Sequence, residues 1–258
     1  MNSTGLSELI IRNIANQKDS FNSNLQEILK IIRLHLNMDV AFISEFTKEK
    51  RIFKFIDSEN NSLLSKINTG DFLEQTYCKK IVDGILPSII NDTSRNSITY
   101  DLDVINILNI GSYLGVPIKL SNGETYGTFC CFKNEPDISL TERDLMLLHT
   151  FSEITDKLID TNIKENLLEK QLKNRIQSVL NNNSIAMHYQ PIYDLNTDTI
   201  SGFEALSRFT PEPYRPPNEW FNEAAQVGLC EELEVMAIES AIESAIESAI
   251  ESAIESAI

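Results

Sequence analysis

The sequence predicts an α+β protein in which an antiparallel sheet with helices is followed by a long helix, a two-stranded hairpin and a helical repeat tail. Three observations carry this prediction. Short apolar runs, two of them joined by an Asn-Gly turn, fill the first part of the chain. A helical pattern without Gly or Pro then runs from Leu140 to about Leu180. The last residues repeat the tetrapeptide Ala-Ile-Glu-Ser.

Composition and charge narrow the class of protein. The 258 residues are 42% hydrophobic and 23% charged, which is typical of a soluble globular protein with one large domain or two modest ones. The net charge of −16 disfavours a nucleic-acid polymer as a partner. No apolar run approaches the length of a membrane span, and the first residues lack the features of a secretory signal. We therefore expect a cytoplasmic protein with no membrane partner.

Apolar spacing places the elements of the first part. Between residues 6 and 36 it is helical, and a polar break from 16 to 24 allows either two helices or one interrupted helix. We expect a separate N-terminal helix within residues 1–21. The predicted strands are 40–46, 52–56, 86–90, 111–120 and 125–132, and the predicted helical segments are 72–82 and 102–108.

Four segments of this part resemble a GAF domain. They are Gln75 to Cys78, Pro87 to Asp92, Gly111 to Ile118 and Tyr126 to Cys130, within about residues 22–160. The resemblance implies a sensory module with a central antiparallel sheet, helices on one side and a ligand cavity on the other. Such domains are often dimeric.

The residues do not identify the ligand of this GAF domain. Cys78 is followed by Lys79, whereas the pigment-attaching cysteine of bilin-binding GAF domains is usually followed by histidine. We expect Cys78 to be a packed core thiol. Tyr77, Tyr113 and Tyr126 line a cavity or belong to the core, and both interpretations stay open.

The cysteines and histidines show no metal-site spacing. The adjacent residues Cys130 and Cys131 point to opposite faces of a strand, and we expect buried thiols there, as at Cys230. The histidines share no motif and are expected to be structural; they are His35, His149 and His188.

The long helix has a predicted start and two possible roles. Ser139 and Glu142 match a capping box, and Asn181 to Ser184 end the helical pattern. We expect its first half to pack on the sheet. The second half, residues 161–183, is either a signalling helix paired in a dimer or a solvated spacer helix.

The next segment, residues 184–236, is read as two strands joined by an Asn- and Asp-rich turn. Tyr189 to Ile192 and Gly202 to Arg208, followed by Trp220 and Glu232 to Glu234, resemble the start of an EAL domain. The EAL family are cyclic-di-GMP phosphodiesterases, and the resemblance implies a TIM-type barrel that opens the cyclic dinucleotide with two divalent metals, Mg or Mn.

The same resemblance assigns roles to four residues. It implies Glu204 as a metal ligand, Gln190 and Arg208 as contacts to the dinucleotide, and Leu206 as an apolar wall beside a base. A carboxylate and a guanidinium in so apolar a strand need partners or a ligand if they are buried. The alternative is an ordinary hairpin with a paired Glu and Arg.

The tail from residue 237 to 258 is an identical repeat. Isoleucines four apart drift by about 40° per repeat around a helix, so no single face is apolar. A tandem expansion of one coding block is one hypothesis, and an error in the recorded sequence is another. The residues from Met187 onward are far fewer than the roughly 200 of a (β/α)₈ barrel, so we expect a truncated output domain without the other metal ligands.

Three hypotheses for function follow. The first is a cyclic-di-GMP signalling protein, a GAF-regulated EAL phosphodiesterase relative with a truncated and inactive output domain. The second is an active phosphodiesterase, completed by another chain or carrying a misrecorded C-terminus. The third is a GAF module for small-molecule sensing or dimerisation without catalysis. Whether the chain is an enzyme stays open, and the expected partners are cyclic-di-GMP, bound weakly or not at all, an unknown GAF ligand and a second copy of the chain.

Overall fold

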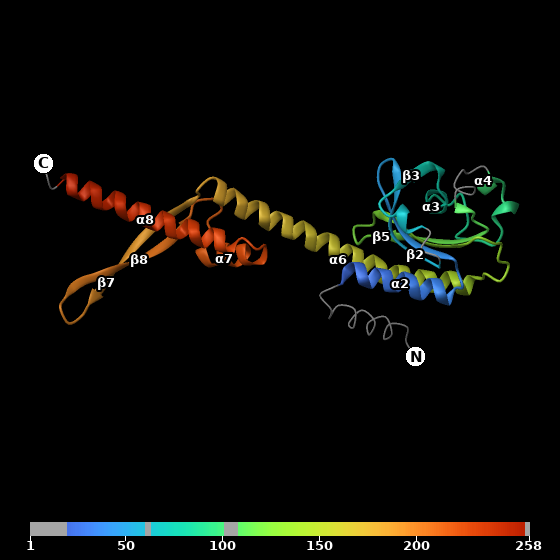
Figure 1. Cartoon of the computed structure of the whole chain (residues 1–258), viewed down its shortest axis with the longest axis horizontal. Coiled ribbons are helices and arrows are strands. Elements are labelled where there is room, and N and C mark those ends of the chain that lie inside the picture. Colours follow the sequence, from blue (N-terminus) through green and yellow to red (C-terminus); the bar gives the residue numbers. More distant parts are fainter. Residues whose placement is uncertain (1–19, 60–62, 101–107, 256–258) are drawn as a thin grey trace. The chain divides into compact units, whose positions relative to one another are not determined.

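The computed structural model describes residues 20–59, 63–100 and 108–255, which divide into two compact units at residue 162 (Figure 1). The helix expected within residues 1–21 and the turn expected at 102–108 lie almost wholly outside the described residues. None of the described helices is long and apolar enough to cross a lipid bilayer.

The first unit is built on a six-stranded antiparallel sheet in the order β3-β2-β1-β6-β5-β4. Its strands are β1 (Val40–Phe46), β2 (Lys50–Ser58), β3 (Gly70–Phe72), β4 (Ile89–Ile90), β5 (Ser112–Lys119) and β6 (Thr125–Lys133). Its helices are α2 (Phe21–His35), α3 (Tyr77–Val82), α4 (Ser97–Tyr100) and the start of α6 (Glu142–Asn181), with 3-10 turns at Leu64–Lys66, Leu73–Gln75 and Thr93–Arg95. The predicted antiparallel sheet with helices is confirmed.

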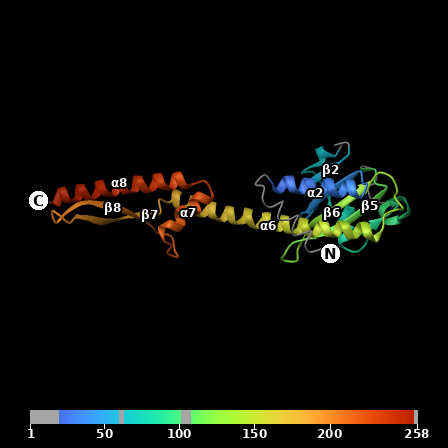
Figure 2. The ribbon, with the colours of Figure 1, turned by 90° about the horizontal axis from the view of Figure 1, so that it is seen from below.

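Both faces of this sheet are covered, which explains the almost continuous apolar sequence of its central strands. Figures 1 and 2 show α2 and the first part of α6 side by side on one face, where Leu29 and Leu148 pack against Ile43. On the other face Phe42, the neighbour of Ile43, packs with Tyr77 of α3. Successive side chains of β1 thus serve two cores, as the two-residue period of a strand requires.

The start of α6 differs from the prediction. The N-cap is Thr141, whose backbone N–H donates to the Asp144 carboxylate at 2.8 Å, and the helix begins at Glu142. The Ser139 hydroxyl donates instead to the carboxylate of Asp137. The capping box predicted at Ser139 and Glu142 is therefore wrong by two residues, because the upstream aspartate occupies the serine side chain.

The single helix predicted over residues 72–82 is also wrong. A 3-10 turn ends at Gln75, and Thr76 interrupts the helical conformation with an extended backbone. The Thr76 hydroxyl accepts a hydrogen bond from the backbone N–H of Lys79 and so caps α3. Gly84, with a positive φ of 72°, follows the helix where the sequence predicted its end.

The second unit combines a hairpin with three helical segments. The strands β7 (Ile185–Asp194) and β8 (Thr199–Phe209) pair antiparallel, as predicted, and α7 (Pro217–Gln226) and α8 (Cys230–Glu255) follow. The core is small and apolar and consists of Ile176, Val179, Phe209, Trp220, Ala224 and Leu233. The end of α6 therefore belongs to this unit.

The Ala-Ile-Glu-Ser repeat forms the greater part of α8. The helix runs without a break from the core residue Leu233 into the repeat. The Tyr189 hydroxyl of β7 donates to the carbonyl of Ala241 at 2.6 Å and joins the hairpin to α8. From Ile238 to Ile254 the repeat isoleucines are all more than half exposed, so this helix buries none of them fully.

Candidate functional site

The hairpin brings together the four residues that the EAL resemblance singles out. In the strand register Gln190 lies directly opposite Glu204, and His188 lies opposite Leu206. Directly opposed residues of an antiparallel pair share a face, and so do residues two apart on one strand. Gln190, Glu204, Leu206 and Arg208 therefore lie on one face of the hairpin. Tyr189, which bonds α8, lies on the other face.

The charged residues on this face are solvated rather than buried. The Glu204 side chain is exposed, and Arg208 is half-buried and donates to the backbone carbonyl of Ser207 at 2.8 Å. In the part of the chain that the structure describes, no ion pair joins Glu204 to Arg208, so the paired Glu and Arg of the alternative hypothesis are absent there. Because the Glu204 carboxylate is exposed to water, it does not incur the desolvation penalty of a buried charge and needs no partner.

The hairpin face offers part of a metal site. A carboxylate and an amide oxygen, from Glu204 and Gln190, are ligands that Mg²⁺ and Mn²⁺ accept. Among residues 20–59, 63–100 and 108–255, no group of three or more His, Cys, Asp or Glu side chains is arranged to hold a metal ion. The described residues therefore do not fit a two-metal centre, which needs several carboxylates around two ions.

A second cluster of polar side chains lies under the sheet of the first unit. The Arg51 side chain is only 2% exposed and pairs with the carboxylate of Asp71. Its guanidinium lies 3.8 Å from the ring centroid of Phe53 and 4.0 Å from the sulfur of Cys78. The Nε–H of Arg51 is buried and has no hydrogen-bond partner among the residues that the structure describes. A buried cation with an unused donor is a candidate ligand-binding group.

Cys78 is the centre of this cluster. Its sulfur lies 3.3 Å from the Tyr113 hydroxyl and 3.9 Å from the sulfur of Cys130. Burial alone favours the neutral thiol, but hydrogen bonding with Cys130 and the charge of Arg51 outweigh it and lower the pKa of Cys78 below its usual value. Burial raises the pKa of Cys130 well above its usual value. The packed core thiol predicted at position 78 is confirmed, with an electrostatic environment that the sequence did not reveal.

The cavity beside this cluster is nearly closed. Its volume is about 10 Å³, and its lining includes Arg51, Cys78, Tyr77 and Tyr113. Such a volume holds at most about one water molecule. Tyr126 packs in the core on the opposite face of the sheet, so of the three tyrosines considered from the sequence it is the one that does not line the cavity.

The sequence analysis did not identify Arg51. The signal was available, because Arg51 lies two residues before Phe53 and therefore shares its face in a regular strand. The contact of Arg51 with Cys78 depends on how α3 packs on the sheet and has no signal in local spacing.

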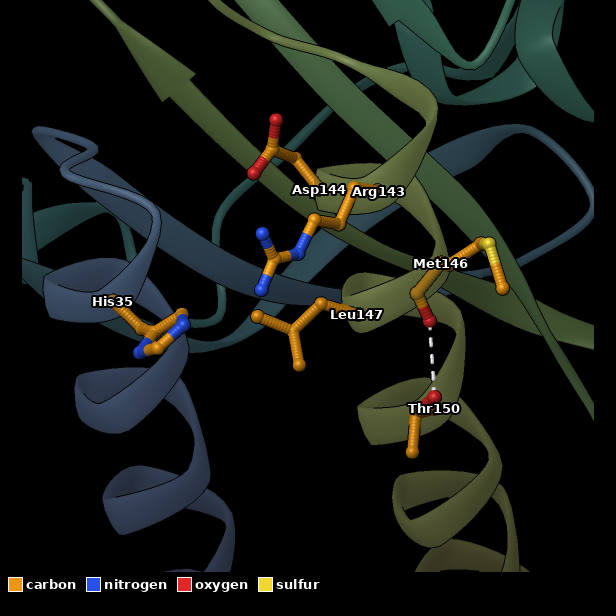
Figure 3. A pocket seen from close by; sticks show the side chains of 6 residues that line it. All are labelled: His35, Arg143, Asp144, Met146, Leu147 and Thr150. Carbon is orange, nitrogen blue, oxygen red and sulfur yellow. Dashed lines mark hydrogen bonds between the residues drawn. The ribbon is translucent and has the colours of Figure 1, made fainter. Parts of the chain in front are cut away.

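A third feature is an open groove between α2 and α6, shown in Figure 3. Its volume is about 490 Å³, and it is lined by His35, Arg143, Asp144, Met146, Leu147 and Thr150. The Thr150 hydroxyl donates to the Met146 carbonyl of the same helix, and Asp144 already caps α6. Two of the polar groups of this groove thus serve the helix, and the groove is a weaker candidate than the buried cluster.

Comparison with known proteins agrees with both resemblances. The GAF domain model matches residues 21–155, and the EAL domain model matches residues 173–255. The "Probable cyclic di-GMP phosphodiesterase PdeB" of Escherichia coli (strain K12) is 38% identical over 68 residues, which are 26% of this chain and 13% of that protein. The chain thus spans a small part of the length of this curated relative.

Two solved structures share the fold of the first unit. A phycoerythrobilin-bound GAF domain from a cyanobacterial phytochrome is 14% identical with a TM-score of 0.50, and the match covers 62% of this chain and 97% of that one. A protein solved in its far-red absorbing dark state with bound biliverdin IXa is 12% identical with a TM-score of 0.50. That match covers 60% of this chain and 97% of the other. The chain therefore belongs to the GAF domain family, and its GAF domain is followed by a partial EAL domain.

Proposed function

We propose that this chain is a cyclic-di-GMP signalling protein in which a GAF sensor regulates an EAL-type output. One observation supports the proposal above the others: the hairpin register gathers Gln190, Glu204, Leu206 and Arg208 on one solvent-facing side. The similarity to the phosphodiesterase relative supports cyclic-di-GMP as the ligand of this side. The cytoplasmic location expected from the sequence stays a prediction.

The chemistry of each side chain suits a contact to the dinucleotide. A guanidinium such as that of Arg208 binds phosphate oxygens through paired N–H groups. Leu206 offers apolar surface to a base, and the Gln190 amide can donate to and accept from a polar edge. Glu204 would provide one ligand to Mg²⁺ or Mn²⁺, and a divalent ion when bound would neutralise phosphate charge.

We further propose that the 258-residue chain by itself does not hydrolyse cyclic-di-GMP. Beside Gln190 the hairpin face presents the carboxylate of Glu204, and Asp194 at the end of β7 accepts the backbone N–H of Asn196 in the turn. A two-metal centre needs several converging carboxylates. The alternative is an active phosphodiesterase, completed when another chain supplies further strands or if the C-terminal sequence is misrecorded. A third alternative is a GAF sensing or dimerisation module without catalysis.

For the sensor, we propose a small ligand that binds beside Arg51. The unused Nε–H of this buried cation supports an acceptor group in the ligand. The cavity of about 10 Å³ has no room for a pigment of the kind held by the two similar structures. A ligand larger than water would have to displace Tyr77 or Tyr113 from their stacked arrangement, in which the ring centroids are 5.0 Å apart.

We propose a homodimer that forms through the GAF unit and α6. Three apolar side chains of α6 support it because they are 39%, 55% and 53% exposed: Ile163, Leu167 and Leu168. Light scattering of the wild-type chain and of a Leu167→Glu variant tests this assembly. A monomer at all concentrations would favour the solvated spacer helix.

The experiment for the output is a titration of the full chain with cyclic-di-GMP in the presence of Mg²⁺ or Mn²⁺, together with chromatography for the linear product. We expect weak binding, no product, and a loss of affinity of at least about tenfold in Arg208→Ala. Glu247→Ala, an exposed glutamate of the repeat, is the matched control for Glu204→Ala and should leave binding unchanged.

The outcomes separate the three hypotheses. Product formation that Glu204→Ala abolishes would establish the active phosphodiesterase and overturn the inactive one. Absence of both binding and product, with stable dimers, would favour the GAF module and overturn the proposed contact face.

A further inference from the structure

We propose that Cys78 and Cys130 are a redox-active pair that hydrogen peroxide converts into an intramolecular disulfide, which links α3 to β6. This proposal concerns the GAF unit and does not rest on cyclic-di-GMP binding. It assigns a covalent chemistry to two thiols that the sequence presents only as core residues.

The geometry of the two sulfurs supports the pair. They lie 3.9 Å apart, whereas a disulfide bond is about 2.05 Å long, so closure requires an approach of about 2 Å. One sulfur belongs to the short helix α3 and the other to a central strand of the sheet. The helix α3 has only six residues, and the closure we propose moves it toward β6.

The surroundings give the two thiols different roles. The guanidinium of Arg51 and the hydroxyl of Tyr113 both lie near the sulfur of Cys78, at 4.0 and 3.3 Å. They stabilise a negative charge on Cys78, whereas no cation of the described residues acts comparably on Cys130, which burial keeps neutral. A thiolate is the nucleophile in thiol oxidation, so Cys78 attacks and Cys130 resolves.

The reaction is balanced in two steps. The Cys78 thiolate attacks one oxygen of hydrogen peroxide, the O–O bond breaks, and the departing hydroxide takes up a proton to become water. The resulting sulfenic acid is attacked by the sulfur of Cys130, whose proton leaves with the hydroxyl group as a second water. The two sulfurs lose two electrons in total, and the peroxide gains them.

Access of the oxidant depends on a local opening. Cys78 is 1% exposed and lines the cavity of about 10 Å³, which is too small for peroxide in the closed form. Short helices at the margin of a domain open more readily than central strands. The reaction therefore proceeds at a rate limited by the opening of α3.

Cys131 provides an internal control within the same strand. It is as buried as Cys130, but it packs on the opposite face of the sheet, with Leu29 and Ile43. Burial raises its pKa above the usual value, and no second cysteine contacts it in the described part of the chain. If burial alone determined oxidation, Cys131 and Cys130 would behave alike.

The experiment uses the full chain with Cys230→Ser, because Cys230 is the least buried of the four cysteines. The protein is treated with hydrogen peroxide, quenched with catalase, unfolded and labelled with N-ethylmaleimide, and the labelled peptides are identified by mass spectrometry. We expect Cys131 to keep its label while Cys78 and Cys130 lose theirs together, at least about tenfold faster. Dithiothreitol should restore both labels.

Three single variants in that background complete the test. Cys131→Ser should leave the disulfide unchanged. Cys130→Ser should prevent it and leave a sulfenic acid on Cys78 that dimedone traps, and Cys78→Ser should protect Cys130. Retention of both labels in a chain shown to be folded by circular dichroism would overturn the proposal, and so would equal loss at Cys131.

Discussion

Phe209→Ala tests whether the partial EAL domain has a cooperative core of its own. Phe209 is 4% exposed and stacks on Trp220, with ring centroids 5.1 Å apart and an angle of 25° between the rings. It also makes an edge contact with Phe221 at 5.7 Å. Truncation of a buried phenylalanine to alanine costs about 3–5 kcal/mol, of which each aromatic pair accounts for about 0.5–1.5 kcal/mol.

Such a loss is large for this unit. Its core contains six buried residues in the part of the chain that the structure describes, and small domains are stable by only a few kcal/mol. We therefore expect Phe209→Ala to unfold the second unit at 25 °C or to bring it close to unfolding. Phe209→Leu keeps most of the volume and should cost about 1–2 kcal/mol.

Phe203→Ala is the matched control. Phe203 belongs to the same strand and, six residues from Phe209, to the same face, but it is 60% exposed. Little apolar surface is buried there, and the expected loss is below about 1 kcal/mol.

Trp220 gives a direct measurement. It is the single tryptophan of the chain, is 1% exposed and lies in the core of the second unit, so its fluorescence reports the unfolding of that unit alone. In urea titrations the transition of Phe209→Ala should be shifted far below that of Phe203→Ala, or be absent with a red-shifted emission in buffer. Equal transitions for the two variants would refute the reasoning that this core holds the unit together.

Three further predictions concern the first unit. Gly127→Ala should destabilise it by more than about 2 kcal/mol in thermal unfolding, because the new methyl group would overlap a main-chain oxygen of β1. The control Gly202→Ala places its methyl group in open space and should change the stability of the second unit by less than about 0.5 kcal/mol. Burial raises the pKa of Asp156 to about 6 in the folded protein, so the folded state binds this proton more tightly than the unfolded state and stability falls as the pH rises from about 4 to about 6. Asp156→Asn should therefore be more stable than the wild type by about 1 kcal/mol at pH 8, allowing for the half-exposed carboxylate, and equal to it at pH 3, which urea titrations at both pH values would check. Asp144→Ala removes the acceptor of the N-cap N–H and should cost about 0.5–2 kcal/mol in the same titrations. Glu142→Ala should cost less than about 0.5 kcal/mol. A larger loss in Glu142→Ala than in Asp144→Ala would support the capping box of Ser139 and Glu142.

Local spacing determined much of the fold. Three local patterns each specify an element without reference to the rest of the chain: the apolar run of β1, the Asn-Gly turn between β5 and β6, and the uninterrupted helical pattern of α6. The hairpin register is different, because Asp194 pairs with Thr199 beside the turn but a bulge between Ile192 and Tyr193 shifts the pairing by one residue. Without that bulge Gln190 would lie opposite Phe203 instead of Glu204, and nothing in the local spacing predicts the bulge. Where the prediction was wrong, as at the start of α6, a neighbouring polar side chain had occupied the cap.

What only the tertiary structure decided is which faces are covered. Periodicity shows that side chains share a face, but it does not show whether another element packs there. The spacing therefore predicts that Glu204 shares a face with Leu206 and Arg208. It does not predict that the Glu204 side chain is exposed to solvent. The proximity of Arg51, Cys78 and Cys130 has the same origin, since β2, α3 and β6 meet only through the order of strands in the sheet and the packing of a helix on it.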